Sequence, residues 1–366
     1  MRWVWSEQVR DTRLPWGLGD RLDSRLGWRL RRYASPLQPL GWLAAGVPPS
    51  RIGYGPGPLT AARRRRHARA AAGKPVRLCL LEGPVRGTRF SPVTAFWVNE
   101  RSRLVHAVVD EPEGADVLWV HTQDPVAPEV RPALERMLAR ARPGAPVLNP
   151  LGAYDAYHRA GTFARLRDAG VSVPDPEPRA GDLVVVKGPG QTSAKELVPY
   201  RPPLAPGHRA FAYVDARGPD GLHRRYRTFH LLGTVHPGDV VSSSAWEVGL
   251  GTLEGHEPTY VMTDEEEEQV RRVGEVLGLD WFCVDHVRRA GDGRPFVTDV
   301  NVYPTAVVGE RVDAQLGARG RWHFLDTAER MGVPEQHGSF WPRFDEAFAR
   351  LLGLDPAPTG TAGATA

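Results

Sequence analysis

The sequence is poor in cysteine and has no long hydrophobic run. Its two cysteines, Cys79 and Cys283, are too few for a disulfide framework, and each lies in an apolar stretch where a buried thiol is expected. No apolar run is long enough to cross a bilayer, and the N-terminus has no apolar signal-like segment. These absences exclude an integral membrane protein and a small disulfide-stabilised fold, and they favour a cytoplasmic location.

Lysine is nearly absent as well, while arginine is abundant. Only three lysines occur against 44 arginines, and two of them, Lys187 and Lys195, flank a glycine-containing loop. A lysine ammonium is a compact point charge, which can fit against a phosphate in places too narrow for a planar guanidinium. In a chain that uses arginine for almost every cation, these two lysines are candidates for a specific chemical role.

What is present is typical of a globular protein of two or three domains, with 366 residues, 41% hydrophobic and 25% charged. Residues 1–75 are a basic, Trp-rich extension, in which 14 arginines and one lysine face four acids, whereas the rest of the chain is mildly acidic. Two interpretations stay open. The extension packs on the body with solvated arginines, or it docks an acidic peptide, a carrier protein or nucleic acid.

The pattern after the extension predicts a small α/β domain. Strand-like runs are expected at 76–81, 93–98, 104–109, 117–121 and 147–148. Apolar residues at helical spacing predict a helix over about 129–141. This order of strands around a helix is typical of an α/β layer.

A second region has mixed helices and strands. A helix is predicted over 155–169 with Gly170 as its C-cap, and a capping box at Thr263 predicts a helix to about Leu277. The acidic cluster 265–268 in its first turn is interpreted as structural, since the helix dipole favours anions there. Strands are expected at 183–187, 210–214, 224–231 and 234–236.

The most informative stretch is a predicted hairpin, with strands 281–289 and 295–303 around a glycine-containing loop. A turn centred on Asp292 places Asp285 opposite Asp299, and Asn301 then lies on the same face. Two facing carboxylates repel each other, and a divalent cation removes that penalty. Oxygen ligands suit Mg²⁺ or Mn²⁺. The alternative is that one aspartate faces solvent and the other pairs with a nearby arginine.

Lys187 ends a valine-rich strand directly before the glycine loop, which places an ammonium beside backbone N–H groups and suits a phosphate. Neither a Walker A motif nor a dinucleotide-binding fingerprint occurs in its required context. Together with the acidic hairpin, Lys187 predicts a MgATP site.

The order of these segments resembles the ATP-grasp superfamily, and most closely its carboxylate–amine ligases. The closing D-x-N of Asp299 and Asn301 after the upstream Asp285 is the most specific element. The resemblance implies an ATP-grasp fold over 151–355, with a lid lobe at about 180–240 and a metal-binding lobe at about 241–355. A small α/β domain over 76–150 precedes it, and 356–366 is expected to be a disordered tail.

The resemblance also implies roles for individual residues. Asp285, Asp299 and Asn301 would bind the metal, and Lys187 would contact the nucleotide and act in catalysis together with Arg227. The remaining nucleotide contacts implied are Arg159, Lys195, Phe211, Tyr213 and Val214. Ala212 stands where the family has a ribose-binding glutamate, and Cys283 where some of its ligases have an arginine.

The implied activity is ATP-dependent joining of a carboxylate to an amine through an acyl phosphate, with a small molecule, amino acid or peptide as substrate and a homodimer as the default assembly. Two alternatives stay open: a small-molecule kinase on the same nucleotide site, and a binder of an acidic peptide or nucleic acid through the basic extension.

Overall fold

The structure is a computed structural model. It describes residues 69, 73–84, 91, 94–95, 98–99, 102–122, 126–158, 161–188, 195–248, 252, 254–257, 260–302 and 340–354. Nearly all of the basic extension, the tail 356–366 and Arg159 lie outside these residues. No described helix is both long and apolar enough for a membrane span. The chain divides into two compact units, Leu151–Val302 and a unit made of Met1–Pro150 with Tyr303–Ala366.

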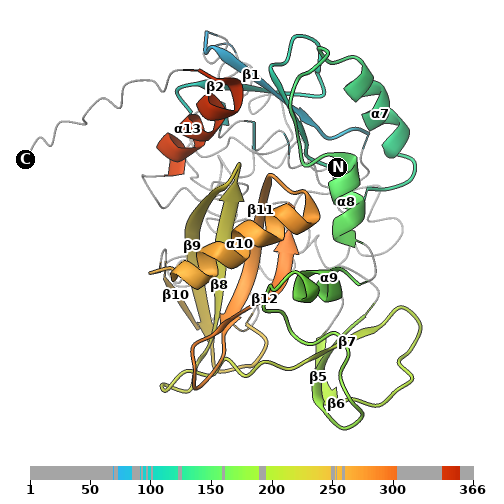
Figure 1. The fold of residues 1–366 in the computed structure, drawn as a ribbon, viewed down its shortest axis with the longest axis vertical. Coiled ribbons are helices and arrows are strands. Elements are labelled where there is room, and N and C mark those ends of the chain that lie inside the picture. Colours follow the sequence, from blue (N-terminus) through green and yellow to red (C-terminus); the bar gives the residue numbers. More distant parts are fainter. Residues whose placement is uncertain are drawn as a thin grey trace, which may run out of the picture. The chain divides into compact units, whose positions relative to one another are not determined.

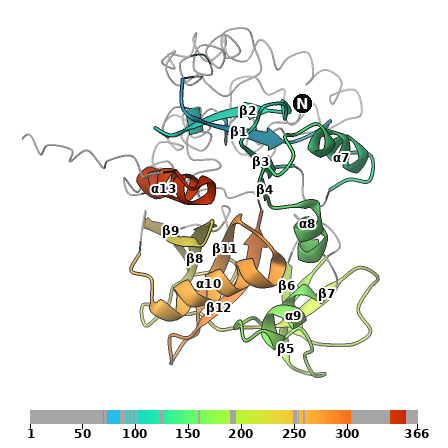
Figure 2. The same cartoon turned by 45° about the horizontal axis from the view of Figure 1, so that its top comes forward.

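The unit that contains Met1–Pro150 is built on a parallel sheet of order β2-β1-β3-β4, whose strands are all labelled in Figure 2 and two of them in Figure 1. Its elements are β1 (Val76–Leu81), β2 (Val105–Val109), β3 (Val117–Val120), α7 (Arg131–Ala139), β4 (Val147–Leu148) and α13 (Phe340–Leu352). Strands β1 and β3 are almost fully buried, as expected for the central strands of a parallel sheet. The predicted α/β layer is confirmed.

The strand predicted at 93–98 is wrong, because the described residues of this segment are helical. Thr94, Ala95 and Val98 are all buried. Their spacing of one and four residues places them on one face of a helix, so Thr94 and Val98, which are β-branched and favour a strand, lie on a buried helical face instead.

Residues Leu151–Val302 begin with two helices, α8 (Leu151–His158) and α9 (Thr162–Asp168). The single helix predicted over 155–169 is therefore wrong. Gly161 caps α9 in the left-handed region, with φ at 86°, and this conformation interrupts the helical path. Gly170 is also left-handed after the end of α9, as its predicted capping role requires.

A three-stranded antiparallel sheet of order β6-β5-β7 follows, and here it is named the small sheet. Its strands are β5 (Leu183–Lys187), β6 (Lys195–Pro199) and β7 (Arg209–Ala212). A five-stranded antiparallel sheet, the large sheet, has the order β10-β9-β8-β11-β12. Its strands are β8 (His223–Leu231), β9 (Thr234–Ser243), β10 (Gly255–Glu257), β11 (Trp281–Arg288) and β12 (Pro295–Asn301).

Helix α10 (Asp264–Leu277) lies across the large sheet (Figures 1 and 2). The predicted capping box is confirmed: the Thr263 hydroxyl accepts from the Glu266 N–H, and the Glu266 carboxylate accepts from the Thr263 N–H. The helix ends at Gly278, with φ at 67°. Its buried side includes Val270, Val273 and Leu277, so one face of the large sheet is covered by α10.

Candidate functional site

The predicted aspartate pair is present on neighbouring strands of the large sheet. Asp285 on β11 lies directly opposite Asp299 on β12, and Cys283 lies directly opposite Asn301. Directly opposed residues share a face of an antiparallel sheet, so Asp285, Asp299 and Asn301 lie on one face. The cross-strand pairing predicted from the sequence is confirmed.

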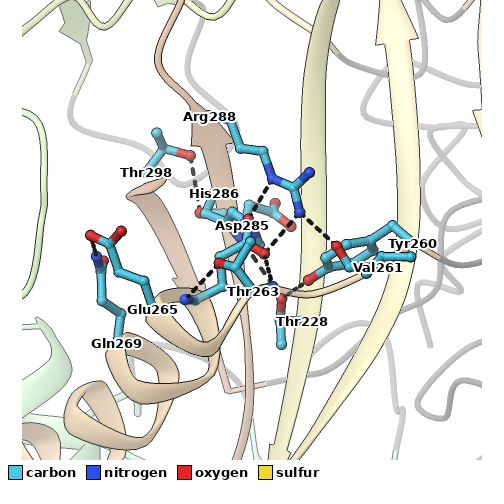
Figure 3. Close-up of polar contacts among 11 residues, drawn as sticks. Thr228, Tyr260, Val261, Thr263, Glu265, Gln269, Asp285, His286, Arg288 and Thr298 are labelled. Carbon is cyan, nitrogen blue, oxygen red and sulfur yellow. Dashed lines mark hydrogen bonds and ion pairs between the residues drawn. The ribbon is translucent and has the colours of Figure 1, made fainter. Parts of the chain in front are cut away.

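The pairing is achieved through a β-bulge that was not predicted. His286 pairs with Val297, whereas Asp285 pairs with Asp299, so Thr298 is an extra residue without a partner on β11. The Thr298 hydroxyl donates to the backbone carbonyl of Asp285 at 3.1 Å, and Figure 3 shows this contact. The pairing that starts at the turn would place Asp285 opposite Thr298 if it continued unchanged. The bulge shifts the pairing by one residue and places Asp285 opposite Asp299.

The donors at this point are two carboxylates and one amide. Among the described residues no group of three or more His, Cys, Asp or Glu side chains could hold a metal. Mg²⁺ typically uses one or two carboxylates and completes its coordination with water and phosphate oxygens, so this donor set fits it. The Asn301 Nδ2 atom is buried and has no hydrogen-bond partner among the described residues.

Asp285 is also bound by an arginine, as the alternative interpretation of the hairpin required. Its Oδ1 accepts from Arg227 Nε at 2.7 Å, and its Oδ2 accepts from Arg227 Nη2 at 2.9 Å. Both side chains are almost fully buried. Burial alone would raise the pKa of Asp285, but the charges of Arg227 and Arg225 outweigh it and hold the pKa well below its ordinary value. Asp285 is therefore a carboxylate at neutral pH.

Asp299 is in a different electrostatic environment. Burial raises its pKa above the ordinary value, the charge of Lys187 opposes this effect, and the charge of Asp285 adds to it. Lys195 and Arg227 also act on Asp299. Two carboxylates at one patch thus have pKa values that shift in opposite directions, which is the expected result when only one of them has an arginine partner.

The small sheet carries a matching group of cations. Lys187 on β5 lies directly opposite Lys195 on β6 and directly opposite Arg209 on β7. Three positive side chains therefore form one row across the sheet on the same face, and like charges at this separation destabilise a sheet. Lys195 has one ion pair, with Glu247 at 3.6 Å between two partly exposed groups. The row has the charge and spacing of a site for a polyanion.

The predicted adenine-binding segment borders this row. Phe211 pairs directly with Val185, its ring contacts the Phe163 ring at 5.1 Å, and the Lys187 ammonium lies 5.8 Å from the Phe211 ring centre. Tyr213 contacts the ring of Trp246 edge-on at 6.4 Å.

Val214, next in the chain after Tyr213, is partly exposed. The described candidate residues of both sheets belong to one compact unit, whereas Arg159 lies outside the described residues.

The opposite face of the large sheet, behind Asp285, holds a buried polar network (Figure 3). His286 Nε2 lies 2.9 Å from Glu266 Oε1, and Arg288 donates to both oxygens of Glu266 at 2.7 and 2.9 Å. Glu266 belongs to the acidic cluster interpreted as structural from the sequence, and these contacts agree with that role. Tyr260 and Thr228 extend the network through a short hydrogen bond.

Two cations of the site were not predicted from the sequence, Arg209 and Arg225. Arg225 Nη1 lies 3.6 Å from Asp285 Oδ2. Nothing in the local sequence distinguishes these arginines from the other 42, because their position follows from strand order and register.

Comparison with known proteins gives similarity in fold. No protein-family model and no curated protein matches the chain. Similar solved structures include the ATP-grasp ligase PsnB, crystallised with a minimal precursor, Mg and ADP (12% identity, 68% of this chain and 98% of that chain, TM-score 0.44). Others are the macrocyclase MdnB from Microcystis aeruginosa MRC (12%, 76% and 99%, 0.44) and an L-amino acid ligase from Bacillus licheniformis (14%, 63% and 67%, 0.39). At these values the likeness assigns no activity to this chain.

Proposed function

We propose that this protein is an ATP-dependent ligase of the ATP-grasp type, which uses Mg²⁺ and joins a carboxylate to an amine. In the proposed reaction a carboxylate oxygen attacks the γ-phosphorus of ATP, the bond to the bridging oxygen breaks, and ADP leaves. The amine then attacks the acyl phosphate, phosphate leaves, and an amide forms with loss of one proton. Both substrates are proposed as a class, small carboxylates and amines that include amino acids and peptides.

One observation carries the proposal: two like-charged cross-strand pairs occur in one unit, Asp285 with Asp299 and Lys187 with Lys195. Each pair by itself is destabilising. The charges of Lys187 and Lys195 lower the pKa of Asp299, which agrees with an electrostatic interaction between the two pairs. A metal–nucleotide complex relieves both repulsions together, because its cation neutralises the carboxylates and its phosphates neutralise the lysines.

The side chains have distinct roles in this proposal. Asp285, Asp299 and Asn301 would hold the metal, and Arg227 would fix Asp285 through its two hydrogen bonds. When bound, Mg²⁺ would neutralise charge on the phosphates. Lys187, Lys195 and Arg209 would orient the phosphate chain, while Phe211, Tyr213 and Val214 would border the base. This division concentrates positive charge where negative charge develops during phosphoryl transfer.

The test is calorimetry of ADP and ATP binding with and without Mg²⁺. We expect the wild type to bind nucleotide only with Mg²⁺, and Asp299→Asn to lose this binding. Asp292→Asn is the matched control, because Asp292 is an exposed residue in the loop of the same hairpin and pairs with Arg289. Equal binding by Asp299→Asn and the control would refute the metal site.

The reaction type is tested by product analysis. Purified protein is supplied with ATP, Mg²⁺ and a panel of free amino acids and short peptides, and hydroxylamine is added as a trapping amine. Release of ADP together with a hydroxamate supports an acyl phosphate. A stable phosphoester would instead identify a kinase and overturn the ligase assignment.

A further inference from the structure

Arg225 is a cation of the candidate site whose hydrogen-bonding capacity is not used within the described protein. It lies on β8, two residues before Arg227, so both side chains lie on the same face of the large sheet as Asp285. Its side chain is 22% exposed, and Asp285 is its ion-pair partner among the described residues.

The contact with Asp285 does not satisfy the guanidinium of Arg225. The distance of 3.6 Å between Nη1 and Oδ2 is beyond hydrogen-bond range, and both oxygens of Asp285 already accept from Arg227. The Nε atom of Arg225 is buried and has no hydrogen-bond partner. A guanidinium offers five donors in a rigid fork that matches the oxygens of a phosphate or carboxylate. Arg225 thus has guanidinium N–H donors that are available to bind an anionic ligand.

The position of Arg225 indicates which anion it meets. The strand order places β11 between β8 and β12, so Arg225 and Asp299 lie on opposite sides of Asp285, with two strand spacings or about 10 Å between their strands. The Lys187 ammonium lies 5.8 Å from the ring of Phe211, in the segment proposed to border the base, whereas Arg225 lies 3.6 Å from Asp285 on the large sheet. The cations are thus distributed along the site, with Lys187 beside the base segment on the small sheet and Arg225 beside Asp285 on the large sheet.

We propose that Arg225 binds the terminal phosphoryl group of ATP, the group that is transferred, and contributes little to binding of the two phosphates retained in ADP. This inference rests on the proposed function and adds to it a residue that distinguishes ATP from ADP. It assigns Lys187 and Lys195 to the retained phosphates and Arg225 to the transferred one.

The experiment compares binding of MgADP with binding of a non-hydrolysable MgATP analogue by calorimetry, using the full chain. The variants are Arg225→Gln and, as a matched control, Arg224→Gln. Arg224 lies next to Arg225 but on the opposite face of β8, where it forms an ion pair with the partly exposed Asp220. Arg225→Lys is a third variant, which keeps the charge but not the fork, and thermal melting checks that each variant folds.

We expect Arg225→Gln to weaken binding of the ATP analogue about tenfold or more, as for a charge-assisted hydrogen bond, and to change MgADP affinity less than about twofold. Arg225→Lys should lie between Gln and wild type, and Arg224→Gln should change neither affinity. If Arg225→Gln weakens binding of both nucleotides equally, or weakens binding of neither, the inference is overturned and the proposed function still stands. Unchanged affinity of Arg225→Gln for both nucleotides would be expected if Arg225 held the substrate carboxylate. A wild type that binds neither nucleotide would refute the proposed function itself.

Discussion

The buried carboxylate of Glu266 is predicted to be a major source of stability for the large sheet. Glu266 accepts hydrogen bonds from the Thr263 N–H at 2.8 Å and from Arg288 Nε and Nη2, and its Oε1 lies 2.9 Å from His286 Nε2. Its side chain is 1% exposed. Burial would raise its pKa, but the hydrogen bonds from His286 and Arg288 lower the pKa from 4.5 to about 2.

The magnitude follows from this pKa difference. A carboxylate with a pKa of about 2 in the folded state and 4.5 in the unfolded state contributes on the order of 3 kcal/mol. Because the folded-state pKa is lowered, this contribution is fully present above pH 4.5 and is lost as the pH falls towards 2. Replacing Glu266 with Gln also leaves Arg288 beside a neutral group, and breaking a buried pair typically costs about 3–5 kcal/mol.

We therefore expect Glu266→Gln to lower the melting temperature by about 6–12 °C at neutral pH, for a unit of this size. Glu268→Gln is the control from the same acidic cluster, since Glu268 is 59% exposed and pairs only at the surface with Arg272. The assay is thermal and urea unfolding at neutral pH and at about pH 3, where the difference between wild type and Glu266→Gln should shrink. Equal effects of the two substitutions at neutral pH would refute the reasoning.

Two further predictions concern the paired aspartates. Thr298→Val removes the hydrogen bond to the Asp285 carbonyl, about 1 kcal/mol, and should weaken Mg²⁺-dependent ADP binding several-fold in calorimetry, while Thr298→Ser should bind as wild type does. If Val and Ser behave alike, the hydroxyl does not hold the bulge. Arg227→Gln leaves a buried carboxylate without its bidentate partner and should lower the free energy of unfolding by about 3–5 kcal/mol. Adding Asp285→Asn should restore much of this loss in urea unfolding, and no recovery would contradict the electrostatic explanation.

The site was partly predictable because its acidic half is local in sequence. Asp285 and Asp299 belong to one hairpin, so the length of the loop nearly determines their pairing. The prediction assumed a uniform register, whereas the structure reaches the same pair through an extra residue, Thr298. In an unbroken strand, residues on the same face are an even number of positions apart. The buried valines Val297 and Val300 are three positions apart, and this spacing indicates the bulge.

The other half was not predictable, because it depends on contacts between distant segments. Arg227 meets Asp285 since β8 pairs with β11 across 58 residues of sequence, and Arg209 meets Lys187 through the pairing of β7 with β5. Periodicity identifies such strands and does not give their order in a sheet. The helix predicted over 155–169 is split for a local reason: the left-handed conformation of Gly161 starts a new helix, and a single glycine inside a helical pattern does not by itself predict such a break.

The bulge at Thr298 also determines how the hairpin would respond to a change in chain length. Side chains alternate between the two faces of a strand, and Thr298 has no partner on β11, so Val297 and Asp299 lie on opposite faces although they are two positions apart. Deletion of Thr298 would remove the bulge and leave a regular ladder, in which Asp299 stays opposite Asp285 and Val300 stays opposite Val284. A one-residue deletion at this position is therefore expected to keep the aspartate pair and to remove only the local bend and the hydroxyl contact that the bulge provides.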